Sequence, residues 1–413
     1  MRIKMKRLSP RIGKGLLLCL SLLVILSPFI IVQVAIPSTL RVMDGNSWDG
    51  TWLQLDVMEN EWVTVNDTAI KQNRQIESTE VVQTAGILKL WGIIPVKAVS
   101  LEVWPEKVLQ AGGTMVGIDL FTDGILVLGT GKVETENGEE SSPAKGILYA
   151  GDKIRKINDE EVITVEDVDK LIADGGVAEV KFDIERNGES KTVWITPKLD
   201  AEGKPRIGIW IRDRAQGLGT LTFVDPEEAT FGAVGHGISD VDTKKLLPIH
   251  TGILSKAKVR QLVKGEVGSP GEVEGSLTGE ICGKITANTD YGIYGTAVDG
   301  IETYGNYEIA LKDQVENGSA VILSDIINET VESYTVKVER ASGIPTFNTG
   351  MVVTVTDERL LEVTGGIIQG MSGCPIIQNG KMIGAVTHVF VKDPTKGYGV
   401  YIEDMLEASK FEG

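Results

Sequence analysis

Ser372 is the residue with the clearest potential for chemistry. It lies in the segment GMSGCP (residues 370–375), which has the form G-x-S-G-x-P. A serine hydroxyl can act as a nucleophile when a glycine-flanked turn projects it and leaves nearby N–H groups free to bind an oxyanion. In this turn the two N–H groups are those of Gly370 and Ser372. A serine between glycines is more often a plain turn residue, so the chemistry requires a base elsewhere in the chain.

The candidates for that base are few, because the chain has only 3 histidines: His236, His250 and His388. His236 lies in GHGISD, and a histidine flanked by glycines suits a cleft or a constrained turn. None of the three has HExxH or similar spacing, so the sequence predicts no metal site and no cofactor. His388 follows the serine turn and is a candidate wall of a specificity pocket, with a structural histidine as the alternative.

A serine nucleophile also needs a carboxylate that orients the histidine. Asp357 follows the β-prone run VVTVT, and rigid strand ends are common positions for catalytic groups. The alternative role of Asp357 is that of N-cap for a short helix over residues 358–363. Asp240 and Asp242, which are close to His236 in sequence, are the other candidate orienters.

The segments around these residues are mainly β. After the serine, residues 376–378 and 382–390 are apolar and flank Asn379-Gly380, which is the strongest short signal for a β-hairpin. From residue 205 onward, short alternating segments are separated by Gly, Asp-Pro and Asn. This pattern predicts a barrel or sandwich over residues 205–413.

Residues 98–199 predict a second domain. A strand at 124–128 precedes SPA, GILYAGDKI and IN. A helix over 164–173 and strands at 177–186 and 191–197 follow, the strands flanking Asn187-Gly188. This order resembles a PDZ domain of the bacterial-protease type. The resemblance implies a groove in which an extended peptide adds as a strand, or else a module that serves only for packing.

In that resemblance, three residues match the loop that holds a peptide carboxylate. They are Val116, Gly117 and Ile118.

The N-terminus predicts a membrane anchor. Residues 1–14 are basic, and residues 15–36 carry no charged side chain, which is long enough to cross a bilayer core of about 30 Å. A cleavable signal is the alternative. Residues 37–97 have no chemical assignment and are interpreted as a spacer with some β structure.

Composition excludes other classes. The formal net charge is −17, and an acidic chain without a basic stripe argues against nucleic-acid binding. Cys19, Cys282 and Cys374 are far apart and lack metal-ligand spacing. Buried free thiols are expected for Cys282 and Cys374, with a disulfide between them as the alternative.

The segments GHGISD, TDERLLEVTGGIIQGMSGCPIIQNGKMIGAVTHVF and DPTKGYGVYIEDML resemble the stage IV sporulation protein B peptidases of endospore-forming bacteria. The resemblance implies a catalytic triad of His236, Asp357 and Ser372. The order His, Asp, Ser is that of the chymotrypsin type, but there the Asp lies far upstream of the Ser. The expected fold is therefore mainly β: an N-terminal transmembrane anchor, a PDZ-like domain, and a chymotrypsin-like β-barrel serine peptidase domain.

The resemblance also implies a signalling role. Such a peptidase is exported from the forespore into the space between the two forespore membranes, where it cleaves itself after the anchor, within residues 37–97. It then cleaves a membrane-bound regulator of an intramembrane protease, which leads to activation of a sigma factor. Two alternatives have other functions: a quality-control protease of the HtrA type, and a catalytically silent PDZ scaffold.

Overall fold

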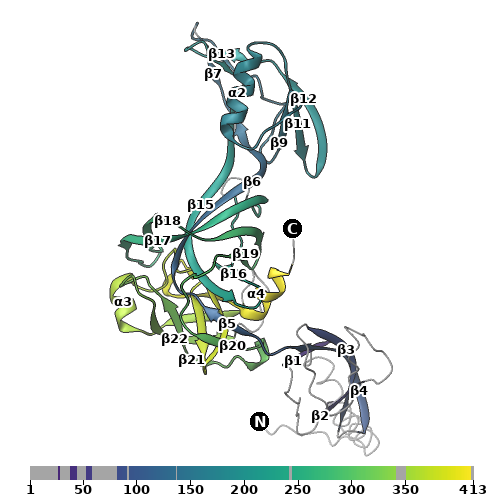
Figure 1. Ribbon diagram of the computed structural model, residues 1–413, viewed down its shortest axis with the longest axis vertical. Helices are drawn as coiled ribbons and strands as arrows, with labels where there is room; N and C mark the ends of the chain where they lie inside the picture. Colours follow the sequence, from purple (N-terminus) through teal and green to yellow (C-terminus); the bar gives the residue numbers. More distant parts are fainter. Residues whose placement is uncertain are drawn as a thin grey trace, which may run out of the picture. The chain divides into compact units, whose positions relative to one another are not determined.

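The computed structural model describes Ser27 and residues 38–43, 53–57, 81–90, 93–135, 137–240, 244–340 and 350–410. The chain divides into two compact units, residues 1–107 and 108–413. The fold is mainly β, as the turn-rich sequence predicts (Figure 1). Among the described residues, no helix is long and apolar enough to span a membrane. The expected anchor over residues 15–36 lies outside the described residues except for Ser27.

The first unit contains one four-stranded sheet in the order β1-β4-β3-β2. Strands β1 and β4 are parallel, and the other neighbours are antiparallel. Leu88, Val99 and Leu101 are buried in it. Strand β4 continues past residue 97, so the segment expected to be a spacer ends inside a strand. The strands are β1 (Thr39–Met43), β2 (Leu53–Val57), β3 (Val82–Leu90) and β4 (Ile94–Trp104).

The second unit begins with a closed ring of six strands, hereafter the first ring. Its pairings run β6-β15-β16-β19-β18-β17 and return to β6. Leu120, Leu254 and Ile285 are fully buried inside it. The strands are β6 (Met115–Thr130), β15 (Ile209–Asp225), β16 (Thr230–Ala233), β17 (Ile249–Val263), β18 (Glu272–Thr289) and β19 (Gly292–Ala297).

The C-terminal half closes a second ring of six strands, in the order β21-β22-β23-β26-β25-β24 and back to β21. Two short strands, β5 (Val108–Ala111) and β20 (Asn306–Ile309), connect β15 of the first ring to β25 of the second. The second-ring strands are β21 (Gly318–Ser324), β22 (Glu332–Arg340), β23 (Met351–Val355), β24 (Pro375–Gln378), β25 (Lys381–Phe390) and β26 (Asp393–Tyr401). The helical elements here are η1 (Lys312–Gln314), α3 (Glu358–Thr364) and α4 (Ile402–Ser409).

Residues 123–213, hereafter the inserted module, interrupt the first ring. The second half of β6 and the first residues of β15 extend out of the ring and pair with each other inside the module (Figure 1). The module has its own core, which includes Ile154, Ile172 and Phe182. Its other elements are β7 (Val133–Glu134), β8 (Glu140–Ser141), β9 (Lys153–Ile157), β10 (Glu160–Glu161), α2 (Val165–Gly175), β11 (Val180–Arg186), β12 (Glu189–Ile195), β13 (Lys198–Leu199) and β14 (Pro205–Arg206).

These boundaries differ from those expected from the sequence. β5 and the first half of β6 lie within residues 98–199, yet they pair with strands of the first ring or with β20. The two-ring unit therefore begins at Val108 and encloses the module, rather than following it at residue 205. The boundary differs because β6 is one continuous strand: its first half belongs to the first ring and its second half to the inserted module.

The locally encoded elements agree with the sequence. Helix α2 begins after Thr164, whose hydroxyl accepts the N–H of Asp167 in a capping box. Asn379 and Gly380, with φ of 51° and 77°, join β24 to β25 in the predicted hairpin. Cys282 and Cys374 are buried free thiols, as expected.

Candidate active site

The serine turn follows helix α3 and a segment bound to the first ring. The helix ends at Gly365, with φ of 75°, and the turn itself contains Gly370 at 106° and Gly373 at 98°. Residues with a side chain rarely adopt such positive φ angles. A Cβ atom on Gly373 would also lie 2.1 Å from the carbonyl oxygen of Thr220. The turn therefore requires its glycines.

Two N–H groups of the turn have no protein acceptor. The N–H groups of Met371, Gly373 and Cys374 donate to backbone carbonyls. Those of Gly370 and Ser372 make no hydrogen bond within the described part of the chain. They are the same two groups that the G-x-S pattern indicates for an oxyanion, and unpaired N–H groups beside a nucleophile suit that purpose.

Strand β15 of the first ring clamps this turn through two buried threonines. The N–H of Thr220 donates to Ser372 O at 2.8 Å, and its hydroxyl donates to Gly370 O at 2.9 Å. The hydroxyl of Thr222 donates to Gly373 O at 2.8 Å. Sequence reasoning missed both threonines. The available signal was GTLTF, in which alternation places the two on one face of a strand.

His236 lies on the loop that follows β16. Val234 and Gly235 both have φ of 72°, which is a strained angle for a β-branched valine. The Nδ1 atom of His236 is 2.9 Å from Gly237 O, so Nδ1 carries the proton and Nε2 is free to accept one. The ring lies against His388 of β25, with centroids 4.3 Å apart.

Burial lowers the pKa of His236 to about 4, and the neighbouring imidazole of His388 adds to the effect. Burial also lowers the pKa of His388. His236 is therefore neutral near pH 7, which is the form that a general base needs.

The histidine loop packs closely against the serine turn and against β25. There is no room for a side chain on Gly373, because a Cβ there would lie 2.6 Å from Val234 N of the histidine loop. A Cβ on Gly235 would lie 3.3 Å from the carbonyl oxygen of Val386 on β25, which accepts the N–H of Gly373. No hydrogen bond joins the Ser372 hydroxyl to His236 in the described chain. Catalytic hydrogen bonds are often long or absent without substrate, so this geometry is compatible with a serine–histidine pair.

Asn288 holds the histidine loop from the end of β18. Its side-chain oxygen accepts the N–H of Ile238 at 2.9 Å, and its amide donates to the carbonyls of Ile238 and Leu247. The sequence gave no signal for this residue, because its partners are about 40 to 50 positions away.

Asp357 is the N-cap of α3, which was the alternative role predicted for it. Its carboxylate accepts the N–H groups of Arg359, Leu360 and Thr335, and it forms an ion pair with Arg359 at 3.2 Å. Burial opposes its charge, but these donors outweigh burial and hold the pKa below its ordinary value. Within the described chain, Asp357 makes no hydrogen bond or ion pair with His236.

The structure also shows where the other candidate residues lie. Asp240 is buried and pairs with Arg212 at 2.5 Å, and Asp242 lies outside the described residues. His250 is exposed on β17. His388 lies against His236, the candidate base.

Val116, Gly117 and Ile118 do not form a peptide-binding loop. They lie within β6, where β15 pairs with one edge and β17 with the other. Their N–H groups therefore serve the sheet, and Val116 and Ile118 are buried. The expectation was wrong because the sequence does not reveal that β6 is a central strand of the first ring.

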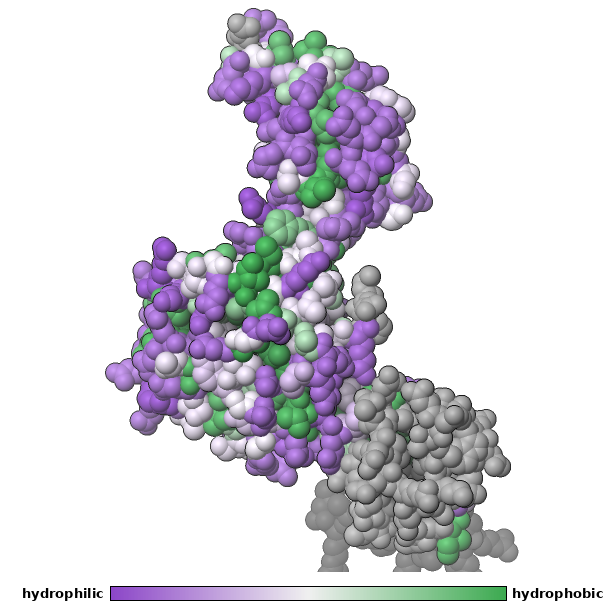
Figure 2. Space-filling view, in the orientation of Figure 1, coloured by the Kyte–Doolittle hydropathy of each residue, from purple (hydrophilic) through white to green (hydrophobic). Residues whose placement is uncertain are grey.

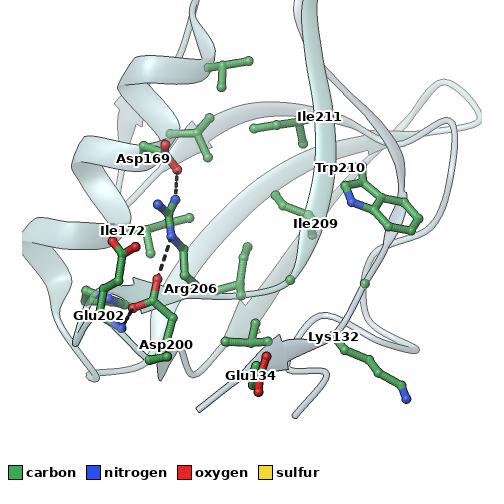
Figure 3. A pocket seen from close by; sticks show the side chains of 18 of the residues that line it. Lys132, Glu134, Asp169, Ile172, Asp200, Glu202, Arg206, Ile209, Trp210 and Ile211 are labelled. Atoms are coloured by element: carbon green, nitrogen blue, oxygen red, sulfur yellow. Dashed lines mark hydrogen bonds and ion pairs between the residues drawn. The ribbon is translucent and has the colours of Figure 1, made fainter. Parts of the chain in front are cut away.

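A groove of about 910 Å³ lies instead between α2 and the start of β15 in the inserted module (Figure 3). Ile172 of α2 faces it, as do Ile209 and Ile211 of β15. In the described chain no strand pairs with the second edge of β15 at residues 209–212. An open strand edge beside a helix is the geometry in which an extended peptide adds to a sheet.

The loop that precedes β15 has an N–H group of the kind expected at residues 116–118, where a loop was predicted to hold a peptide carboxylate. Gly208 has φ of 69°, and its N–H has no acceptor within the described chain. Arg206 lies between Asp169, at 2.9 Å, and Asp200, at 3.4 Å (Figure 3). Figure 2 shows a strip of hydrophobic surface along the visible face of the module, with hydrophilic residues on both sides.

Residues 203–406, which contain the serine turn and the histidine loop, match the SpoIVB peptidase S55 family. The chain belongs to this family. It is accordingly a serine peptidase. No curated protein matches it significantly.

Solved structures show weaker similarity to this SpoIVB-family chain. The PDZ domain of an SdrC-like protein from Listeria monocytogenes is 25% identical, covering 22% of this chain and 87% of that one, with a TM-score of 0.18. The Rv3671c protease from M. tuberculosis in its active form is 14% identical over 48% and 75%, with a TM-score of 0.28. The HtrA-type protease AlgW with a tripeptide is 11% identical over 46% and 54%, at 0.29. These scores are low, so the family assignment rests on the sequence match.

Proposed function

We propose that this SpoIVB-family peptidase is an endopeptidase with Ser372 as nucleophile and His236 as base. The observation that supports it best is the serine turn, in which the N–H groups of Gly370 and Ser372 have no partner among the described residues while β15 clamps the neighbouring carbonyls. His236 lies between β16 and β17 of the first six-stranded ring, and Ser372 lies between β23 and β24 of the second. One candidate residue from each ring suits a chymotrypsin-like double barrel.

In the proposed reaction, His236 Nε2 takes the proton of Ser372 as the hydroxyl oxygen attacks a peptide carbonyl. The N–H groups of Gly370 and Ser372 bind the tetrahedral oxyanion. His236 then gives the proton to the leaving amine. It next takes a proton from the water that hydrolyses the acyl-enzyme, and finally returns it to Ser372.

The group that orients His236 in this scheme is the carbonyl of Gly237. It accepts the Nδ1 proton and so fixes the tautomer that leaves Nε2 as base. Asp357 shapes the start of α3, which leads into the serine turn. The triad role expected for Asp357 would require its carboxylate to leave that cap.

We further propose that the enzyme acts in sporulation signalling. Its substrates would be itself, cut within residues 37–97, and a membrane-bound regulator of an intramembrane protease. Residues 15–36 would anchor it in the inner forespore membrane, with the remainder in the intermembrane space until cleavage releases it. The groove of the inserted module would bind an extended peptide segment.

The deciding experiment follows the full chain and its Ser372→Ala variant by intact mass over several hours. We expect only the wild type to lose N-terminal segments, and only the wild type to be labelled by a fluorophosphonate. Labelling with no cleavage of itself would indicate an enzyme that needs a partner. Absence of labelling would contradict the proposal and favour a scaffold.

Cleavage of unfolded casein distinguishes a signalling peptidase from a quality-control protease. A signalling peptidase should cut one or two sites in native partners and leave casein largely intact, whereas a protease of the HtrA type should degrade it.

A further inference from the structure

Residues 366–369 lead directly into the serine turn, and their backbone is held from both rings. The N–H of Ile367 donates to Pro394 O, at the start of β26, at 2.8 Å. The N–H of Gln369 donates to Gly271 O, just before β18, also at 2.8 Å. These bonds fix the directions of the side chains at positions 367 and 368.

The two isoleucines of this segment are equally buried but have different neighbours. Ile367 and Ile368 are each 1% exposed. A Cβ on Gly397 of β26 would lie 2.7 Å from Ile367 Cδ1, whereas a Cβ on Gly271 would lie 2.8 Å from Ile368 Cγ2. Ile367 therefore fills space beside the second ring, and Ile368 fills space beside the first.

Strand β25 borders the same space as Ile367. Val389 pairs with Gly397 and packs against the hydrophobic cluster that contains Ile367. Val386 pairs with Gly399, so β25 has one more residue than β26 between the two pairs, which is a β-bulge. Ile367, Val389 and Gly397 together form one apolar surface, hereafter the apolar wall.

The position of this wall relative to the reacting bond follows from the stereochemistry of acyl transfer. The attacked carbon carries three groups besides the serine oxygen. Its oxyanion lies at the N–H groups of Gly370 and Ser372, and its leaving amine must face His236, which protonates it. The remaining group is the substrate residue that supplies the carbonyl, hereafter P1. It is therefore directed away from the histidine loop, toward residues 366–369 and β25.

We propose that the apolar wall sets the cleavage specificity, with Ile367 limiting P1 to small aliphatic side chains such as those of alanine and valine. The inference rests on the proposed function, whose substrate class it names. Residues 366–369 and 386–390 contain no Asp, Glu, Lys or Arg, so a charged P1 side chain would lose its hydration without gaining a partner. A large P1 side chain would need the volume that Ile367 occupies, and pocket shape distinguishes P1 residues in serine peptidases.

Backbone contacts keep the segment from moving aside to make room. A Cβ on Gly366 would lie 2.1 Å from Pro394 O, and a Cβ on Gly397 would lie 2.5 Å from His388 O. Main chain thus packs directly against main chain on both sides of the wall. The depth available to P1 is consequently set by the side chain at position 367.

Phosphonate inhibitors test the wall without a known substrate. Diphenyl phosphonate analogues of blocked amino acids each present one P1 side chain, and the serine oxygen bonds to phosphorus as phenol is released. The full chain is treated with the alanine, valine, phenylalanine and lysine analogues, and intact mass follows the rate of modification. We expect the alanine and valine analogues to react at least about 100-fold faster than the other two.

Ile367→Ala removes three carbon atoms from the wall. It should raise the rate of the phenylalanine analogue relative to that of the alanine analogue by at least about tenfold. Ile368→Ala is the matched control, because it removes the same atoms from an equally buried position that faces the first ring, and it should leave this ratio at the wild-type value. If Ile367→Ala fails to fold, Ile367→Val removes one carbon atom and should raise the ratio by about threefold or more.

The outcomes separate this inference from the proposed function. A wild type that is not modified by a fluorophosphonate without a P1 side chain contradicts the proposed function. A wild type that this reagent modifies, but that reacts fastest with the phenylalanine or lysine analogue or with none of the four, overturns the role of the apolar wall. Equal shifts in Ile367→Ala and Ile368→Ala, or no shift in either, overturn it as well.

Discussion

The imidazole rings of His236 and His388 lie 4.3 Å apart and are tilted by 34°. One follows β16 of the first ring and the other lies on β25 of the second, so the proposed base sits where the two rings meet. Burial and the second imidazole together lower the pKa of His236 to about 4. The pair keeps the base neutral well below pH 7, although a base with so low a pKa is also a weaker one.

The first prediction concerns pH. A base is active when unprotonated, so the acid limb of kcat/KM should fall near pH 4, well below the ordinary histidine value of 6.5. His388→Phe keeps an aromatic neighbour but removes the positive charge that His388 can carry. Its acid limb should move upward yet remain below 6.5, because burial persists. An acid limb at 6 to 7 in the wild type would contradict the burial of His236 in the free enzyme, because kcat/KM reports the groups of the free enzyme.

The free energy of unfolding should also depend on pH through the low pKa of His236. The unfolded chain binds a proton on His236 more tightly than the folded chain does, because the folded pKa is the lower one. The contribution of this group is therefore complete above pH 6.5 and is lost as the pH falls toward 4. Urea unfolding of the wild type and His236→Phe at pH 7 and pH 5 measures it. The wild type should lose more stability between the two pH values than the variant does.

The second prediction concerns the oxyanion site. Gly370→Ala places a Cβ 2.9 Å from Val273 in a residue with φ of 106°, so the turn must shift. Loss of one oxyanion donor costs about 10²- to 10³-fold in kcat. Gly217→Ala, on β15 with open space around it, is the control and should change kcat little. Comparable losses in both variants would argue that glycine replacement acts through general destabilisation.

Local signals were readable in the sequence, and long-range pairings were not. Asn379-Gly380 specifies a hairpin turn through its own backbone preferences, and the predicted hairpin is confirmed. The helix predicted over residues 164–173 is also confirmed as α2, with Thr164 as its N-cap. The pairing of β6 with β15 joins residues about 90 positions apart across the inserted module. No local pattern encodes that register, which is why residues 116–118 were misinterpreted as a loop.

In the candidate site, too, the sequence predicts the local features and not the features that depend on the fold. The motif GMSGCP indicated the two N–H groups that have no acceptor in the described part of the chain, because the glycines and the serine are close in sequence. Gly237 O was missed as an acceptor because any residue can supply a carbonyl. Asp357 was ambiguous, since a residue that caps a helix and one that orients a histidine have the same side chain.

The third prediction separates those two roles of Asp357. Asparagine is as good an N-cap as aspartate, so Asp357→Asn should keep α3 and reduce kcat/KM by less than about tenfold. Asp357→Ala should lower the free energy of unfolding by about 1 kcal/mol or more. Loss of a true triad carboxylate costs about 10⁴-fold in kcat. A loss of that size in Asp357→Asn, with unchanged stability, would show that the carboxylate reaches His236 during turnover.

The last prediction tests the clamp on the serine turn. Thr220→Val and Thr222→Val preserve shape but leave the carbonyls of Gly370 and Gly373 without their hydroxyl donors. Each should lower the free energy of unfolding by about 1–3 kcal/mol, the cost of an unsatisfied buried acceptor. If the clamp also positions the oxyanion donors, kcat should fall while KM changes little, because the affected interaction forms only in the transition state.

Thr278→Val is the matched control for the clamp, since that hydroxyl donates to a carbonyl on an exposed hairpin. It should leave both kcat and stability nearly unchanged. The double variant of Thr220 and Thr222 completes a cycle: both threonines hold one turn, so the combined loss in kcat should be smaller than the product of the single losses. Simple multiplication of the two losses would mean that the threonines act on separate parts of the site, and the turn would then not move as one unit.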